Sequence, residues 1–213
     1  MRFKRHCEYS LLLLALFASL TVAAQERIVG LPCEGCDYVF VNPPATVPTT
    51  ARIGPADEPG EAMRLEGIVR NAAGQPQANV IIYAYQTDAK GIYPPGPVRH
   101  GRLRAWAQSD ASGRYRFDTI RPIGYPNTDI PQHIHLHVLE TGRCSYYIDD
   151  VVFADDPRLT PRQREAHARG RGGSGVVTPR KDLSGGWLVE RDITLGAGIS
   201  GYDRCASVAT ANR

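Results

Sequence analysis

After residue 24, the sequence contains no hydrophobic run long enough to cross a membrane, because a spanning helix needs about 20 apolar residues. The one marked apolar run, residues 11–20, follows a basic start and precedes the small residues Val22, Ala23 and Ala24. This layout is typical of a secretory signal peptide. We therefore expect residues 1–24 to be cleaved near Ala24, the mature chain to be secreted or periplasmic, and no stable membrane span to remain.

The sequence also has little net charge. The full chain of 213 residues carries a formal charge of +3, to which residues 1–24 contribute three basic residues and one acidic residue. The expected mature chain therefore carries only +1, which gives no electrostatic basis for binding nucleic acid. Its length suits a single domain with a sizeable hydrophobic core.

Cysteine is scarce, and only one pair is closely spaced. Of five cysteines, Cys7 lies in the expected signal peptide, and the others are Cys33, Cys36, Cys144 and Cys205. The "CEGC" motif could be half of a zinc site or a redox pair, but the sequence has no second CxxC and no thioredoxin-like βαβ pattern. Four cysteines allow three pairings, and in an exported chain we favour the structural disulfides Cys33–Cys36 and Cys144–Cys205.

The amino-acid composition of the chain changes near residue 63. Residues 37–62 are rich in proline, threonine, alanine and glycine, and we expect residues 25–62, which include the CEGC motif, to form an extended arm. Beyond them, runs of β-branched and aromatic residues predict strands within 63–71, 78–88, 103–120, 133–140, 145–155 and 186–195. Short strands separated by turns predict an all-β sandwich or barrel over residues 63–213, with long irregular loops.

Three connecting segments carry more specific predictions. "DASG", residues 110–113, predicts the turn of a hairpin between two alternating runs. Residues 160–170 form the one helix-like piece, with Pro161 suited to a first turn. The basic stretch "RGRGGSG", residues 169–175, predicts a solvated loop.

Half of the six histidines lie within "PQHIHLHVLE", residues 131–140, where His133, His135 and His137 alternate with apolar residues. On a strand, alternate side chains point to opposite faces, so the three imidazoles share one face and the apolar residues face the core. Neighbouring histidines lie roughly 6.5 to 7 Å apart at about 3.3 Å per residue, and their rings can converge on one ion. The outer two lie about 13 Å apart, so the pattern predicts a pair of metal ligands rather than three.

Read with its flanks, this stretch resembles the intradiol ring-cleavage dioxygenases, the family of catechol and protocatechuate 3,4-dioxygenases. The likeness covers roughly residues 65–195 and rests on "GIVRNAAGQPQANVIIYAYQTDAKGIY", "SDASGRYRFDTIRPIGYP", "PQHIH" and "IDDVVFADDP". The first two pieces are shared with transthyretin-like sandwiches. The order Tyr93, Tyr125, His133, His135 at these spacings is specific to the dioxygenases.

The resemblance implies a non-haem Fe(III) ion held by Tyr93, Tyr125, His133 and His135. Phenolate and imidazole suit a ferric ion better than thiolate. It further implies a small aromatic diol and O2 as substrates, and cleavage between the two hydroxylated carbons to a cis,cis-muconate-type product. Both tyrosines would be catalytic: Tyr125 would be displaced by the substrate, and Tyr93 would stay. The oligomeric state is left open.

The chain departs from the family pattern at two positions near the expected substrate pocket. The family usually has an arginine three residues before the first histidine, where this chain has Ile130. It often has a glutamine on the next strand, which corresponds to Asp150, or to Asp149 if the register slips by one. These changes favour catechol-like or hydroxyquinol-like rings over an anionic one. His137 either lines the pocket or is structural.

The same departures keep a second hypothesis open. A transthyretin-like sandwich could retain the ligands, bind a metal or a small molecule, and lack turnover. Arginines elsewhere in the sequence could also replace the missing cation, the candidates being Arg99, Arg102 and Arg121.

Overall fold

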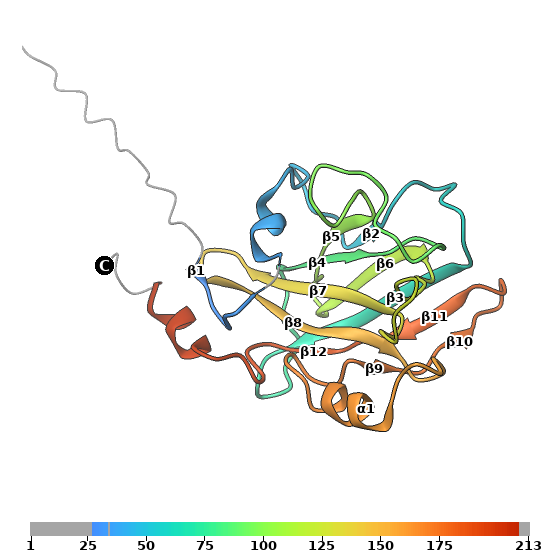
Figure 1. Cartoon of the computed structure of the whole chain (residues 1–213). Coiled ribbons are helices and arrows are strands. Elements are labelled where there is room, and N and C mark those ends of the chain that lie inside the picture. Colours follow the sequence, from blue (N-terminus) through green and yellow to red (C-terminus); the bar gives the residue numbers. More distant parts are fainter. Residues whose placement is uncertain (1–26, 34, 209–213) are drawn as a thin grey trace, which may run out of the picture.

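Two six-stranded sheets face each other in the computed structural model, which describes residues 27–33 and 35–208 (Figure 1). The first sheet runs in the order β1 (Arg27–Ile28), β8 (Cys144–Phe153), β7 (His133–Glu140), β4 (Val80–Gln86) and β5 (Arg104–Gln108), with β9 (Val176–Val177) paired to β8. The second sheet runs in the order β10 (Arg180–Lys181), β11 (Trp187–Glu190), β3 (Ala62–Arg70), β6 (Arg114–Ile120) and β2 (Thr50–Arg52), with β12 (Ile193–Thr194) paired to β3.

The core lies between the sheets and follows the alternation read from the sequence. From β7, Ile134, Leu136 and Val138 are fully buried in the main hydrophobic cluster, which they share with Leu65 of β3 and Phe117 of β6. The histidines of β7 point to the other face of the first sheet. This arrangement confirms the all-β sandwich, because each strand gives one face to the core.

The expected hairpin around "DASG" is wrong. β5 pairs with β4 in the first sheet, whereas β6 pairs with β3 and β2 in the second, so the turn carries the chain from one sheet to the other. The turn itself forms locally, because the Asp110 carboxylate accepts hydrogen bonds from the amides of Ser112 and Arg114. The side-chain hydrogen bonds of Asp110 therefore explain why the chain turns here, whereas the packing of the core determines which strands β5 and β6 pair with.

The segment before β3 is irregular over most of its described length, yet it packs onto both sheets. β1 adds in parallel to β8, and β2 adds in parallel to β6. Val29, Val39 and Ile53 are buried, and a short 3₁₀ helix, η1 (Cys36–Phe40), begins at the last cysteine of the CEGC motif. The proposed signal peptide, residues 1–24, lies outside the described residues. The part of the chain that is described contains no helix both long and apolar enough to cross a membrane.

The one predicted helix is confirmed as α1 (Pro161–Ala168). Thr160 caps it: its hydroxyl accepts from the Gln163 amide, and the Gln163 side chain accepts from the Thr160 amide. Such a reciprocal capping box satisfies two backbone donors at a helix start, and Pro161 costs nothing there. The helix buries no residue, so it serves mainly to lead the chain into the glycine-rich loop that follows.

Two disulfides join the pairs favoured from the sequence, Cys33–Cys36 and Cys144–Cys205. The second ties a 3₁₀ helix near the end of the chain, η2 (Tyr202–Val208), to the start of β8 across 61 residues. A crosslink stabilises mainly by restricting the unfolded chain, and more so for a longer loop.

Replacing both Cys144 and Cys205 with alanine is expected to lower the free energy of unfolding by about 4 kcal/mol. The Cys33–Cys36 disulfide closes a loop of only a few residues. The matched replacement of both cysteines with alanine is therefore expected to lower the free energy of unfolding by about 2 kcal/mol. Urea unfolding of the two double variants measures both values. Equal losses would show that loop length does not govern the stabilisation.

Candidate metal centre

Two histidines of β7 bring their rings together on the face of the first sheet that points away from the core. His133 Nε2 lies 3.1 Å from His135 Nε2. The pairing of β7 with β8 contains a bulge here, because one residue of β7, His135, opposes two residues of β8. A bulge of this kind re-aims side chains, and this one turns Asp150 toward His135 and Asp149 away from it. The bulge resolves the alternative between the two aspartates that the sequence left open.

Two tyrosines reach the histidine pair from separate loops. Tyr93 follows β4 and Tyr125 follows β6; their hydroxyl oxygens lie 2.5 Å apart, and Tyr93 Oη lies 3.1 Å from His135 Nε2. Both loops carry a glycine shortly before the tyrosine. A Cβ on Gly91 would overlap the carbonyl oxygen of Gly124, so glycine lets the two loops touch at this point. The glycines thereby bring the hydroxyl groups of the tyrosines together.

The outer nitrogen of each histidine is held by an acceptor. His133 Nδ1 donates to the carbonyl of Pro131 at 2.7 Å, and His135 Nδ1 donates to Asp150 Oδ1 at 2.8 Å. Tyr147 Oη also donates to Asp150 Oδ1, at 2.7 Å. Burial alone would raise the pKa of Asp150, but its electrostatic interaction and its hydrogen bond with His135 outweigh burial and lower that pKa to about 2. Asp150 is therefore a carboxylate that fixes the ring of His135.

The donor chemistry of this cluster fits a cation. With a proton on each Nδ1, the lone pairs of both Nε2 atoms face one another and Tyr93 Oη. Burial, followed by the nearby charge of His135, lowers the pKa of His133, so this ring stays neutral. Burial, followed by the hydrogen bond with Tyr125, raises the pKa of Tyr93, so its phenolate needs a compensating positive charge. Two imidazole lone pairs and two phenol oxygens within 3.1 Å of a neighbour suit a ferric ion.

A cavity of about 440 Å³ opens beside the cluster. Its wall is formed by Pro32, Tyr85, His135, Tyr147, Asp150 and Arg171. Of the three residues expected to line a substrate pocket, only Asp150 does so. Ile130 is 44% exposed on the loop before β7, and His137 is fully buried and does not line the cavity.

Aromatic packing supports the cluster from behind. The ring of Tyr85 stacks on both His135 and His100, with centroids 4.4 Å apart in each case. Sequence reasoning missed Tyr85, Tyr147 and Arg171 as members of the site, and it left open whether the segment 99–102, which contains His100, belongs to it. Tyr85 stands two positions from Tyr83 on β4, and its outward face was readable from alternation, but its contact with the histidines depends on the pairing of β4 with β7.

His137 lies outside the cavity wall in this arrangement. It is fully buried among the rings of Tyr83, Tyr85 and Tyr147, and neither ring nitrogen has a hydrogen-bond partner within the described residues. Burial lowers its pKa to about 3, so the ring is neutral.

Replacing His137 with leucine is expected to raise the free energy of unfolding by about 1 kcal/mol, because two unpaired polar atoms leave the interior. The variant should bind metal as the unmodified chain does. Chemical denaturation and metal analysis check both expectations, and a variant that no longer binds metal would make His137 part of the centre.

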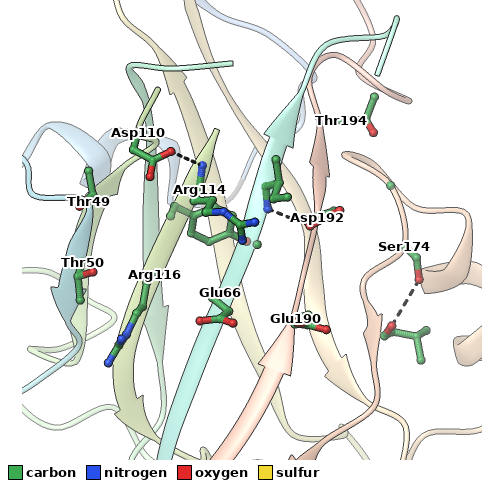
Figure 2. A pocket seen from close by; sticks show the side chains of 15 residues that line it. Thr49, Thr50, Glu66, Asp110, Arg114, Arg116, Ser174, Glu190, Asp192 and Thr194 are labelled. Carbon is green, nitrogen blue, oxygen red and sulfur yellow. Dashed lines mark hydrogen bonds between the residues drawn. The ribbon is translucent and has the colours of Figure 1, made fainter. Parts of the chain in front are cut away.

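A larger hollow of about 720 Å³ lies on the outer face of the second sheet (Figure 2). Its labelled charged residues come from β3, β6, the turn before β6 and the segment around β11: Glu66, Asp110, Arg114, Arg116, Glu190 and Asp192. The Arg116 side chain points away from Glu66 and pairs with Asp118. It shares no residue with the cavity beside the histidines. Its mixed charges and open form give it no defined ligand chemistry.

Comparison with known proteins gives a consistent picture. A family model described as "Dioxygenase" matches residues 33–170. The protocatechuate 3,4-dioxygenase beta chain of Burkholderia cepacia is 32% identical over 114 residues, which are 47% of this chain and 48% of the relative. Catechol 1,2-dioxygenase 2 of Acinetobacter lwoffii is 26% identical over 148 residues, 56% of this chain and 54% of the relative. The chain thus spans about half the length of the curated relatives it matches.

Solved structures share the fold. The dioxygenase domain of a dioxygenase–carbohydrate-binding protein fusion from Streptomyces sp. SirexAA-E superposes with a TM-score of 0.56 at 22% identity, covering 71% of this chain and 90% of that one. Catechol 1,2-dioxygenase from Acinetobacter sp. ADP1 gives a TM-score of 0.53 at 24% identity, covering 70% of this chain and 58% of that one.

Proposed function

Because this chain belongs to the family of intradiol ring-cleavage dioxygenases, we propose that it is itself such an enzyme, with a non-haem ferric ion. It would insert both atoms of O2 into a catechol-type ring and cleave between the two hydroxylated carbons, giving a cis,cis-muconate-type dicarboxylate. The observation that carries the proposal is the convergence of two histidine nitrogens and two tyrosine oxygens, each within 3.1 Å of a neighbour.

The residues that would hold the ion are Tyr93, Tyr125, His133 and His135. When bound, a ferric ion would supply Lewis acidity and draw electron density from the diol oxygens, which makes the ring reactive toward O2. No outside reductant is needed, since the diol provides all the electrons and both oxygen atoms end in the product. The protein's contribution is to hold the ligands, place the ring and take up its protons.

The two tyrosines differ in a way that suits unequal roles. Tyr93 packs against Tyr85, His100 and Tyr125, and its hydroxyl contacts His135. Tyr125 lies on a loop whose next five residues are all exposed. We expect Tyr93 to stay in place and Tyr125 to move aside and accept a proton from the incoming diol.

Asp150 has a positioning role in this proposal. Its Oδ1 accepts from both His135 and Tyr147, so one carboxylate oxygen holds a ligand and a wall of the cavity at the same time. Because the hydrogen bond directs the Nδ1 proton of His135 outward, Nε2 keeps its lone pair for the metal. The glutamine common in the family could accept the same proton, but it would carry no charge.

Turnover with labelled oxygen tests the proposal. The iron-loaded full chain is supplied with ¹⁸O2 and with catechol, hydroxyquinol or larger catechols, and the products are weighed by mass spectrometry. We expect one O2 consumed per ring opened and both labelled atoms in the dicarboxylate. Bound iron without O2 consumption on any diol would favour a binding module of transthyretin-like fold, and a quinone product would exclude ring cleavage.

The proposed signal peptide adds an expectation about the cellular location of the protein. Cleavage near Ala24 and export to a secreted or periplasmic location agree with the presence of two disulfides, which persist in oxidising compartments. N-terminal sequencing of the exported protein tests this part independently of activity.

A further inference from the structure

One wall of the cavity carries a cation that the sequence did not point to. Arg171 lies in the glycine-rich loop after α1, and its guanidinium carbon is 4.4 Å from the centroid of the Tyr147 ring. Its side chain is 31% exposed and faces the cavity together with Asp150 and His135. The loop was expected to be solvated, but it presents this arginine to the centre instead.

The composition of the loop explains how the arginine reaches the cavity. A Cβ on Gly170 would overlap the Asp149 carboxylate, one on Gly172 would crowd the Ile148 side chain, and one on Gly175 would overlap the Asp150 carbonyl. Glycine at these positions lets the loop lie flat against β8 at its bulge. The alternation of glycine and arginine in "RGRGGSG" is therefore a packing requirement, with Arg171 as the side chain that is left to point inward.

A buried arginine holds the loop in this shape. Arg191 is 1% exposed, and its guanidinium donates to the backbone carbonyls of Arg171, Gly172, Gly173 and Asp192. Three carbonyls of the loop held by one planar guanidinium leave the loop little freedom. Arg171 therefore enters the cavity from a fixed backbone.

Asp149 fixes the side chain of Arg171 as well. Its carboxylate accepts from the Arg171 amide at 3.1 Å and from Arg171 Nε at 2.8 Å. The two terminal nitrogens of the guanidinium have no hydrogen-bond partner within residues 27–33 and 35–208. A guanidinium anchored through Nε keeps its outer edge available, and that edge matches the two oxygens of a carboxylate.

The other arginines that could have supplied a cation to the cavity do not line it. Arg102 pairs with Glu58, and Arg121 pairs with Asp155 at 2.7 Å while its guanidinium lies over the Trp187 ring. Neither lines the cavity, and neither does Arg99. Asp150 also lines it, but its negative charge is already shared between His135 and Tyr147.

We propose that Arg171 is the specificity-determining residue of this site, and that it binds an anionic substituent, such as a carboxylate, on the ring or side chain of the diol. The inference rests on the proposed function for the position of the diol. It replaces the sequence-based preference for uncharged rings, because Arg171 of the glycine-rich loop places a cation on the cavity wall, which Ile130 does not line.

Anaerobic titration calorimetry on the iron-loaded full chain tests the proposal with 3,4-dihydroxybenzoate and its uncharged isostere 3,4-dihydroxybenzamide. The readout is the ratio of the two affinities, so that a general loss of binding cancels. We expect the unmodified chain to prefer the benzoate by about tenfold to a hundredfold, the range for hydrogen bonds to a charged group. Arg171→Gln should remove that preference, and Arg171→Lys should restore part of it.

Arg169→Gln is the matched control, because it removes the same charge from the same loop. Arg169 is 80% exposed and pairs with Glu165, so the ratio should remain that of the unmodified chain. Equal affinities in the unmodified chain, or a preference that survives Arg171→Gln, would overturn the proposal. A preference that depends on Arg171 without O2 uptake on any diol would instead overturn the proposed function and leave the anion contact standing.

Discussion

His135→Ala is expected to lower the rate of O2 consumption by more than about 100-fold and to lower the iron content of the purified chain. Removing the hydrogen-bonding support of a metal ligand typically costs 10- to 100-fold, so removing the ligand itself should cost more. Tyr93→Phe should have the same effect, because it deletes the phenol oxygen that contacts His135. Iron analysis and an oxygen electrode measure the two quantities.

Two buried neighbours provide matched controls for this prediction. His137→Leu removes an imidazole, as His135→Ala does, and Tyr83→Phe removes a phenol hydroxyl, as Tyr93→Phe does. His137 and Tyr83 are both fully buried on the same face of the first sheet. Both variants should keep full iron content. Retention of iron by His135→Ala, or its loss from both controls, would place the metal elsewhere.

Asp150→Ala is expected to lower iron affinity or turnover by about 10- to 100-fold. Without the carboxylate, the His135 ring loses the acceptor that fixes its orientation, and the Tyr147 hydroxyl loses its partner. Asp150→Asn keeps an oxygen in the same place and removes only the charge, so it should lose less. Competition with an iron chelator ranks the three proteins by affinity.

Asp155→Asn serves as the control for the loss of a carboxylate. Asp155 is 45% exposed and pairs with Arg121 at the surface, so chelator competition should give the value of the unmodified chain. If Asp150→Ala bound iron as tightly as the unmodified chain, the contact with His135 would have no part in holding the metal.

At β7, the alternation of apolar and polar residues along the strand was enough to predict which side chains face the core. Alternation put Ile134, Leu136 and Val138 in the core and the histidines on the other face, and strand spacing reduced three histidines to a pair. Both statements depend only on neighbours along one strand. The tyrosines came from the ordered motifs of a family, since no local rule places loop residues 32 positions apart beside each other.

Features that depend on the contact of distant segments were not readable. The turn at Asp110 was recognised, yet alternation does not say which sheet each strand joins. The bulge opposite His135 decides which aspartate faces the metal centre, and it arises from the pairing of β7 with β8. The role of the loop around Arg171 depends on Arg191, whose burial gives no signal in the sequence because buried arginines are rare.

The central claim is that Tyr93, Tyr125, His133 and His135 together hold a ferric ion. The visible absorption spectrum of the chain after stoichiometric iron loading tests it most directly, because tyrosinate bound to Fe(III) gives a burgundy charge-transfer colour. We predict that colour in the unmodified chain and in His137→Leu, and its loss in Tyr93→Phe and His135→Ala. A chain that binds one equivalent of iron and stays colourless would contradict the account.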